Sequence, residues 1–376
     1  MGIILKKHFA RDMAFSDIPA AHNRYRIGRY KTVLALLVLE VFCLTGCGNE
    51  KTQAPRTTLS PSISQETPEA MLTPFAGPEE QVETVFELEK FGSGDIKFYG
   101  NGIICGKNHL YLLDLDGKTI KEYPELAVNW IDGISDEGIV IYGNFAKETG
   151  IVRLDEDKNI KEQLYNNRSE NLRIDQTINR FDDKYYMTAT EIEGNVNNSD
   201  PAKKCGKYTI RLFRSDDAVN WTELPDVAVA DNNLEDVDVS YADGRIYVCY
   251  EKEKIDKGDS AIVLKYSDDK GQSFCDEKLL IEADCDHEPV SFFKDGDEYV
   301  LLYSCDKDDR GSSYNGAKIY SARYDKNFNC IEKDREIATE TKEGLLWYDY
   351  MVNGDTEYYL FAGNYITENN MILGSR

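Results

Sequence analysis

Two short segments carry the same pattern of turn-forming residues followed by an aromatic side chain. Residues 215–222 read SDDAVNWT, and residues 267–274 read SDDKGQSF. In each segment a short acidic side chain can accept hydrogen bonds from the backbone amides of its own turn. Gly271 supplies a backbone angle that other residues avoid, and the closing aromatic residue can fill the gap between adjacent sheets. The two segments predict hairpin turns at the rim of a β-structure, and we assign them no chemistry.

This pattern resembles the Asp-box, a hairpin-turn motif of sialidase-type β-propellers. The resemblance implies the fold and does not extend to the sialidase site. Sialidases clamp the substrate carboxylate with three arginines. Arg173, Arg180, Arg245 and Arg323 are present, but none stands in a recognisable sialidase context.

A second pattern recurs six times, with a turn rich in Asp, Asn and Gly before a run of β-branched and aromatic residues. The turns begin at Asn101, Asp136, Asp182, Asp243, Asp295 and Asn353. Such turns suit tight hairpins and such runs favour strands. A spacing of about 36 to 61 residues is typical of propeller blades.

The chain is therefore expected to be all-β, with a β-propeller domain over residues 85–376. We predict six blades, with five as the alternative. The last copy of the repeat lacks a clear fourth strand, and residues 85–91 (VFELEKF) can supply it. This closure would leave no open sheet edge.

The N-terminal segment reads as a bacterial targeting signal. Seven Lys and Arg residues precede an apolar run at 32–39, and Leu-Thr-Gly-Cys follows at 44–47. This order is similar to the lipobox of bacterial lipoproteins, which implies that Cys47 is diacylated and becomes the first residue. The apolar run is too short for a transmembrane anchor, and Glu40 interrupts it. Met13 is an alternative start.

Residues 1–47 are thus predicted to be a lipoprotein signal peptide, and the Pro-, Ser- and Thr-rich residues 48–84 a disordered linker. We expect an exported monomer, lipid-anchored to the outer face of the bacterial cell membrane. After residue 47 the chain holds 37 basic and 65 acidic residues, a net charge of −28. This charge disfavours nucleic acid and anionic membrane surfaces as partners. No cofactor is expected, and calcium is left open.

Seven cysteines fall in the predicted propeller, and none shows metal-ligand spacing such as C-x-x-C. No metal site is therefore predicted. Cys105 and Cys249 lie inside apolar strand patterns and are expected to be buried thiols. Four others flank loops and can form a disulfide outside the cell, namely Cys275, Cys285, Cys305 and Cys330.

Each predicted innermost strand of the second to sixth copies begins near an acidic residue. These acids are Asp132, Asp175, Asp236, Glu288 and Asp349. Inner strands of a propeller run in parallel, so their first residues converge on one face. With the aromatic residues Trp130, Trp347 and Tyr348, they predict a pocket of carboxylates and aromatic platforms at the channel mouth. Such a pocket suits carbohydrate, because paired carboxylates can act as acid, base or nucleophile on a sugar.

The third to fifth copies also resemble arabinanase/xylosidase-type propeller glycosidases. The resemblance implies Asp175 as base, Asp236 as the residue that tunes the acid, and Glu288 as acid. The chain departs from that family in three respects. Gln176 stands where Pro usually follows the first Asp, Tyr348 and Asp349 stand where a histidine is expected, and those enzymes usually have five blades.

Simpler roles compete with these assignments. An acid at a strand start can serve as an amide-binding turn residue, which is the interpretation that we favour for Asp132 and Asp349. His287 is a candidate proton-transfer partner of Glu288, but a surface-loop histidine is the favoured interpretation. We therefore favour a surface-anchored module that binds a carbohydrate or protein ligand without catalysis. The alternative is a glycoside hydrolase acting on a neutral glycan.

Overall fold

The computed structural model describes residues 75–76, 80–91, 96–128, 130–144, 148–166, 172–193, 207–253, 259–307, 314–341, 344–365 and 367–376. The predicted signal peptide, with Cys47, lies outside these residues, as does most of the predicted linker. Every regular element within the described ranges is a β-strand. A search of the same ranges finds no helix long and apolar enough to cross a membrane.

The strands form six sheets, each built on four antiparallel strands or more, which we number as blades in chain order. Blade 1 consists of β4 (Lys97–Tyr99), β5 (Gly102–Lys107), β6 (His109–Asp114) and β7 (Thr119–Tyr123). Blade 2 consists of β8 (Trp130–Ile134), β9 (Ile139–Asn144), β10 (Glu148–Leu154) and β11 (Ile160–Asn166). Blade 3 consists of β12 (Leu172–Phe181), β13 (Lys184–Ile192), β14 (Tyr208–Ser215), β15 (Trp221–Glu223) and β16 (Ala228–Ala230). Blade 4 consists of β17 (Leu234–Ala242), β18 (Arg245–Glu253), β19 (Ser260–Ser267) and β20 (Lys278–Ile281). Blade 5 is built on β21 (His287–Asp295), β22 (Glu298–Cys305), β23 (Lys318–Tyr324) and β24 (Cys330–Ala338). Blade 6 consists of β25 (Leu346–Asn353), β26 (Thr356–Gly363), β27 (Asn370–Ser375) and β3 (Glu83–Leu88).

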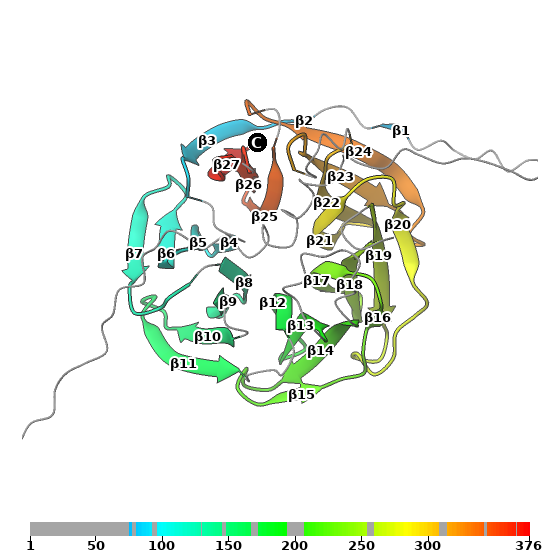
Figure 1. Cartoon of the computed structure of the whole chain (residues 1–376), viewed down its shortest axis with the longest axis horizontal. Helices are drawn as coiled ribbons and strands as arrows, with labels where there is room; N and C mark the ends of the chain where they lie inside the picture. Colours follow the sequence, from blue (N-terminus) through cyan, green and yellow to red (C-terminus); the bar gives the residue numbers. More distant parts are fainter. Residues whose placement is uncertain are drawn as a thin grey trace, which may run out of the picture. The chain divides into compact units, whose positions relative to one another are not determined.

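Figure 1 shows the six blades around a common axis, with β4, β8, β12, β17, β21 and β25 innermost. The predicted six-bladed propeller is confirmed, and the five-bladed alternative is not. Six apolar clusters hold the blades together, one between each neighbouring pair. Leu212 of blade 3 and Val248 of blade 4, for example, are fully buried in one cluster.

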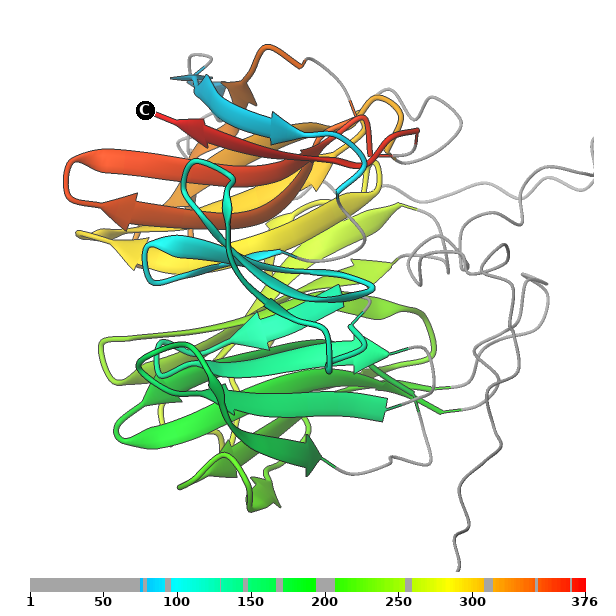
Figure 2. The same ribbon diagram turned by 90° about the vertical axis from the view of Figure 1, so that its left-hand side faces the viewer.

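The ring closes through the N-terminal strand, as the sequence predicts. β3 pairs antiparallel with β27, so that Phe86 lies opposite Leu373. The two strands lie side by side in both ribbon views (Figures 1 and 2). Blades 6 and 1 also share an apolar cluster, which includes Leu360 and Ile103. β27 is therefore not an edge strand, because β3 covers it as the outermost strand of blade 6.

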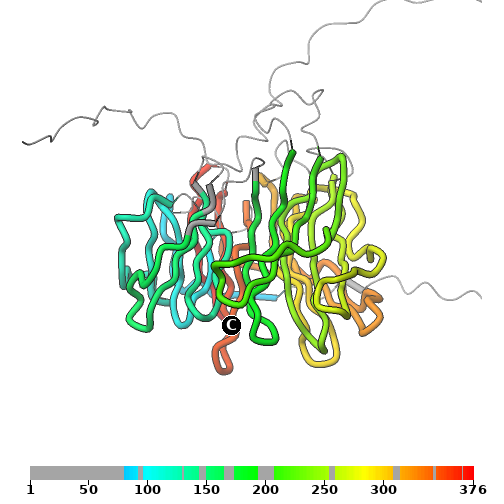
Figure 3. Tube along the Cα trace, turned by 90° about the horizontal axis from the view of Figure 1, so that it is seen from below, coloured from blue at the N-terminus to red at the C-terminus, as the bar shows by residue number. Residues whose placement is uncertain are grey.

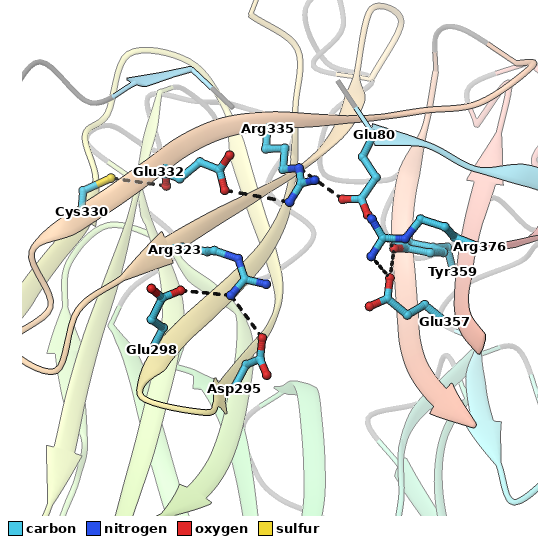
Figure 4. A network of polar contacts seen from close by, with 10 residues as sticks. All are labelled: Glu80, Asp295, Glu298, Arg323, Cys330, Glu332, Arg335, Glu357, Tyr359 and Arg376. Carbon is cyan, nitrogen blue, oxygen red and sulfur yellow. Dashed lines mark hydrogen bonds and ion pairs between the residues drawn. The ribbon is translucent and has the colours of Figure 1, made fainter. Parts of the chain in front are cut away.

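Regular structure begins before the predicted boundary at residue 85. β1 (Phe75–Ala76) and β2 (Glu80–Gln81) both pair in parallel with β24 of blade 5. Glu80 is 7% exposed and forms ion pairs with Arg335, at 3.3 Å, and with Arg376 (Figure 4). Arg376 also pairs with Glu357. This network fastens the end of the chain to the N-terminal strands, since a buried carboxylate is stable only when paired.

The two hairpin turns singled out from the sequence have the predicted hydrogen bonds. Oδ1 of Asp217 accepts the amides of Val219 and Asn220 at 2.9 and 2.8 Å. Oδ1 of Asp269 accepts the amide of Ser273 at 2.8 Å. These bonds stabilise the ionised carboxylates and lower both pKa values, that of Asp269 to about 2 through Ser273 and Ser267.

The aromatic residues that end the two turns fill gaps between blades, also as predicted. Trp221 packs against the cluster between blades 2 and 3, and Phe274 against the one between blades 3 and 4. Three further outer turns use an aspartate in the same way, although their sequences do not show the full pattern. They are centred on Asp114, Asp155 and Asp325.

The outer turns just described and the first residues of the inner strands lie at opposite ends of the blades. The turn between the first and second strands follows the end of each inner strand, and the red turn between β25 and β26 projects at the lower end in Figure 3. The first residues of the inner strands therefore lie at the other end, where the acids are.

Candidate functional site

The five acids predicted from the sequence all lie in innermost strands. Asp132 lies in β8, Asp175 in β12, Asp236 in β17, Glu288 in β21 and Asp349 in β25, each within the first four residues of its strand. The predicted placement is therefore confirmed for blades 2 to 6. Trp130 is the first residue of β8, and the position of its side chain lies outside the described structure.

All five strands carry a pairing irregularity beside the acid. The register shifts between Ile174 and Thr177, and again between Glu235 and Asp238. Within these shifts Asp175 and Asp236 both have φ of 50°, the left-handed region that side chains with a Cβ rarely adopt. Corresponding shifts occur in the other three strands. Such bulges re-aim side chains and are frequent next to functional sites.

Three of the acids accept hydrogen bonds from the inner strand of the next blade. Oδ2 of Asp175 accepts the amide of Asp236 at 3.0 Å. Oδ2 of Asp349 accepts the amide of Phe98 at 2.7 Å, across the interface between the last and first blades. Oδ2 of Asp132 accepts the side-chain amide of Gln176 at 3.0 Å. Amide binding, which we favoured for Asp132 and Asp349, thus occurs. Both have a partner in the neighbouring blade, and Asp349 also accepts the amide of Tyr350 in its own strand, at 2.9 Å.

Asp238 belongs to the same set and was not predicted. Its Oδ2 accepts the amide of Phe292 at 2.8 Å. Its side chain is half-buried, on the innermost strand of blade 4. Burial therefore raises its pKa to about 6, with Asp349 adding to the rise while the Phe292 amide and Lys97 oppose it. Its position two residues after Asp236, inside a strand pattern, is the signal that could have found it.

Glu288 is enclosed rather than open. It is 7% exposed, and Oε1 accepts a hydrogen bond from the hydroxyl of Tyr314. Tyr314 is itself buried, with its ring edge-on to Tyr365 at 5.0 Å between centroids. Tyr314 thus covers this carboxylate.

The structure corrects the role predicted for two aromatic residues. Trp347 and Tyr348 are each 1% exposed and belong to the clusters on either side of blade 6. Nε1 of Trp347 donates to the carbonyl of Tyr320 at 3.3 Å, and the hydroxyl of Tyr348 donates to Asn369 at 3.0 Å. These side chains pack between blades and present no face to a sugar, so we remove them from the candidate site.

The surface-loop interpretation of His287 is also wrong, since its side chain is buried among cysteines. Its Nε2 lies 3.4 Å from Sγ of Cys285, and Cys305 completes a buried group. The hydrogen bonds from Cys305 and from the imidazole lower the pKa of Cys285 to about 6, while the pKa of Cys305 is raised. For His287, the contact with Cys285 outweighs burial and raises the pKa.

The disulfide anticipated among the loop cysteines is not formed. Cys275, Cys285, Cys305 and Cys330 are free thiols, as are the other cysteines within the described ranges. Cys105 and Cys249 are buried, as predicted.

Neither a protein-family model nor a curated protein matches the chain. Solved structures do. A Dyadobacter fermentans protein of unknown function is 11% identical with a TM-score of 0.54, and the match covers 80% of this chain and 96% of that one. Trypanosoma rangeli sialidase is 10% identical with a TM-score of 0.49, over 80% of this chain and 58% of the sialidase. An α-L-arabinofuranosidase from Lactobacillus brevis is 11% identical with a TM-score of 0.39, over 65% and 90%.

Both families that the sequence patterns resemble are thus among the similar structures. At these identities the likeness shows the propeller fold alone, and the chain spans little more than half of the sialidase. The chemistry of the candidate site is therefore indicated by the acids themselves. Carboxylates that face sugar hydroxyls accept hydrogen bonds, and a carboxyl group whose pKa lies near 6 can also donate a proton.

Proposed function

We propose that this protein is a binding propeller that captures a neutral carbohydrate where the inner strands begin, without cleaving it. One observation carries the proposal. Asp175 and Asp236 occupy equivalent bulges in neighbouring blades, both have φ of 50°, and one accepts the amide of the other. Strained backbone of this kind persists where its surroundings hold it, and it clusters at ligand sites.

Charge favours a neutral ligand. Several carboxylates gather at one end of the blades, and the chain beyond residue 47 carries a net charge of −28. An anionic sugar or a nucleic acid would be repelled, whereas the hydroxyl groups of a neutral glycan can donate hydrogen bonds to carboxylates.

The existing contacts of the acids favour binding over catalysis. A glycosidase needs two carboxyl groups facing each other across the scissile bond, about 5 to 9.5 Å apart. Here one oxygen of Asp175 already accepts a backbone amide, and Glu288 is buried beneath Tyr314. Both groups are thus already engaged by donors of the protein, whereas a proton-transfer pair must contact the substrate.

Glycoside hydrolysis is the second candidate. The observation that favours it is that Asp175, Asp236 and Glu288 lie on three consecutive inner strands. On this proposal Glu288 is the general acid, Asp175 the base or nucleophile, and Asp236 tunes the pKa of the acid.

A binding and turnover assay on the full chain distinguishes carbohydrate binding from glycoside hydrolysis. Binding of neutral oligosaccharides is measured by calorimetry, and reducing-end release is followed on the same panel. We expect binding without release, weakened at least tenfold by Asp236→Asn, and unchanged by the matched Asp269→Asn at the opposite end of the blades. Release that Glu288→Gln abolishes would establish the hydrolase instead. If no neutral glycan binds, or a protein ligand alone binds, the carbohydrate proposal is wrong.

We further propose that the propeller is an exported monomer tethered to the outer face of the bacterial membrane by lipidated Cys47. The basic, apolar and Leu-Thr-Gly-Cys order of residues 1–47 supports this placement. Fractionation of cells that express the wild type and Cys47→Ser tests it. The wild type should fractionate with the membrane and incorporate a fatty acyl label. The Cys47→Ser variant should not incorporate the label.

A further inference from the structure

Three buried side chains beside the candidate site converge on one point. Cys285 lies in the segment before β21, His287 begins β21, and Cys305 ends β22, where it is the cross-strand partner of His287. The two Sγ atoms and a ring nitrogen of the histidine all lie within 4.8 Å of one another. From this arrangement we infer a metal site for Zn²⁺, with Cys285, His287 and Cys305 as ligands.

The histidine is held in the orientation that a metal requires. Nδ1 lies 2.8 Å from the carbonyl oxygen of Ser260, which can only accept, so Nδ1 carries a proton. Nε2, the nitrogen nearer to Cys285 at 3.4 Å, is therefore the one that can ligate a metal once it has lost its own proton. A ligating histidine commonly donates its other N–H to a backbone carbonyl in this way. The Ser260 hydroxyl also accepts the amide of His287 at 2.7 Å, so ring and backbone are both fixed.

One edge of the group has the length expected for a tetrahedral ion, and the other edges lie within 4.8 Å. With Zn–S of about 2.3 Å and Zn–N of about 2.05 Å, sulfur and nitrogen ligands at the tetrahedral angle stand about 3.6 Å apart. The separation of 3.4 Å between Cys285 Sγ and His287 Nε2 is close to this edge. Two thiolates and an imidazole are soft and borderline ligands, which favour Zn²⁺ over Mg²⁺ or Ca²⁺.

Asp284 lies beside the group but is not one of the side chains whose ligand atoms all lie within 4.8 Å of one another, so the fourth position is left for water or for Asp284 after its carboxylate has moved. Oδ1 of Asp284 lies 3.4 Å from the same Nε2, and the corresponding nitrogen–oxygen edge of a zinc tetrahedron is also about 3.4 Å. The carboxylate approaches from the solvent side, since Asp284 is exposed whereas the other three residues are buried. A bound ion would then join the segment before β21 to the ends of two strands, directly beside Glu288. Binding would release the thiol protons that remain.

The test uses the full chain purified under reducing conditions without a metal-binding tag. Zinc content is measured directly, and Co²⁺ titration reports tetrahedral thiolate ligands through charge-transfer absorption. We expect one ion per chain. Cys285→Ser, Cys305→Ser and His287→Asn should each weaken binding by more than the roughly 10- to 100-fold typical of losing an outer partner. Asp284→Ala should weaken it by no more than about tenfold, because its exposed carboxylate lies beside the three ligands and is not one of them.

Cys330→Ser is the matched control, because this thiol lies in the same blade but outside the cluster. The affinity of this variant for Co²⁺ and Zn²⁺ should equal that of the wild type. Circular dichroism of each metal-free variant checks the fold, and the Co²⁺ spectrum of the wild type remains decisive if a variant does not fold. A reduced wild type that binds neither Zn²⁺ nor Co²⁺ stoichiometrically would overturn the inference. A Cys285–Cys305 disulfide mapped in protein isolated from its own compartment would also overturn it. Neither result depends on whether a glycan binds.

Discussion

Aspartates do the same hydrogen-bonding task in two regions of this propeller, but over very different lengths of chain. In the outer turns, Asp217 and Asp269 accept amides two to four residues away, and their side chains are exposed. At the inner-strand starts, Asp175, Asp238 and Asp349 accept amides that are 61, 54 and 251 residues away. The outer aspartates shape a hairpin, whereas the inner ones connect neighbouring blades.

The difference matters for energetics. An exposed turn that loses its acceptor can exchange the lost bonds for bonds to water. An amide between two blades is part-buried and less accessible to water, and a donor left unsatisfied there carries part of the cost of desolvation. Substitutions at the inner positions should therefore cost more, and should loosen contacts between blades.

The largest effect is expected at the closing interface. Asp349→Ala removes the acceptor of the Phe98 amide, at 2.7 Å, and of the Tyr350 amide, at 2.9 Å. We expect the free energy of unfolding to fall by about 3 kcal/mol, because a charged acceptor is lost and an amide between blades 6 and 1 is left unpaired. Urea denaturation measures the change. Asp349→Asn keeps an acceptor oxygen and should lose less than half as much; equal losses would show that the charge, and not the acceptor, matters.

A second prediction concerns the charge of Asp238. Its pKa in the folded protein, about 6, lies above the ordinary value of 3.8. The folded state then binds more protons than the unfolded state between these pH values, so stability falls as pH rises from about 4 to 6. Asp238→Asn does not titrate and keeps an acceptor for the Phe292 amide. It should match the wild type near pH 4 and exceed it by about 2 kcal/mol at pH 8.

Urea denaturation at both pH values measures this difference between the two proteins. A constant difference across the range would contradict a raised pKa. A variant less stable than the wild type at pH 8 would mean that the ionised carboxylate stabilises the blades, so that this half-buried acid would behave like the exposed ones.

Features of the outer turns and of single strands were predictable from the sequence, whereas contacts between blades were not. Turn chemistry at 215–222 and 267–274, the six repeated turns and the closing strand were predictable, because local patterns specify them. The acids of the inner strands were also placed correctly, since each begins a recognisable repeat. Their hydrogen-bond partners were not predictable, because the next blade supplies them.

The aromatic and cysteine residues show where local patterns stop. Trp347 and Tyr348 follow the loop before an inner strand, where exposure is expected, but the sides of blade 6 bury them. The Cys285, His287 and Cys305 group was missed because strand pairing joins residues that are about twenty positions apart. The adjacent Cys-Asp-His at 285–287 was the available signal, and it lacks the spacing of common zinc motifs.

The smallest effect is expected at an outer turn. Asp269→Ala removes the acceptor of the Ser273 amide and of the Ser267 and Ser273 hydroxyls. Because the folded-state pKa of Asp269 is lowered to about 2, its contribution is present above about pH 4 and is lost as pH falls toward 2. We expect Asp269→Ala to lose less than half the stability lost by Asp349→Ala at pH 7, and the gap to the wild type to narrow at pH 3. Urea denaturation at both pH values measures this. If the turn variant is the less stable of the two, hairpin formation, and not contact between blades, limits the stability of this propeller.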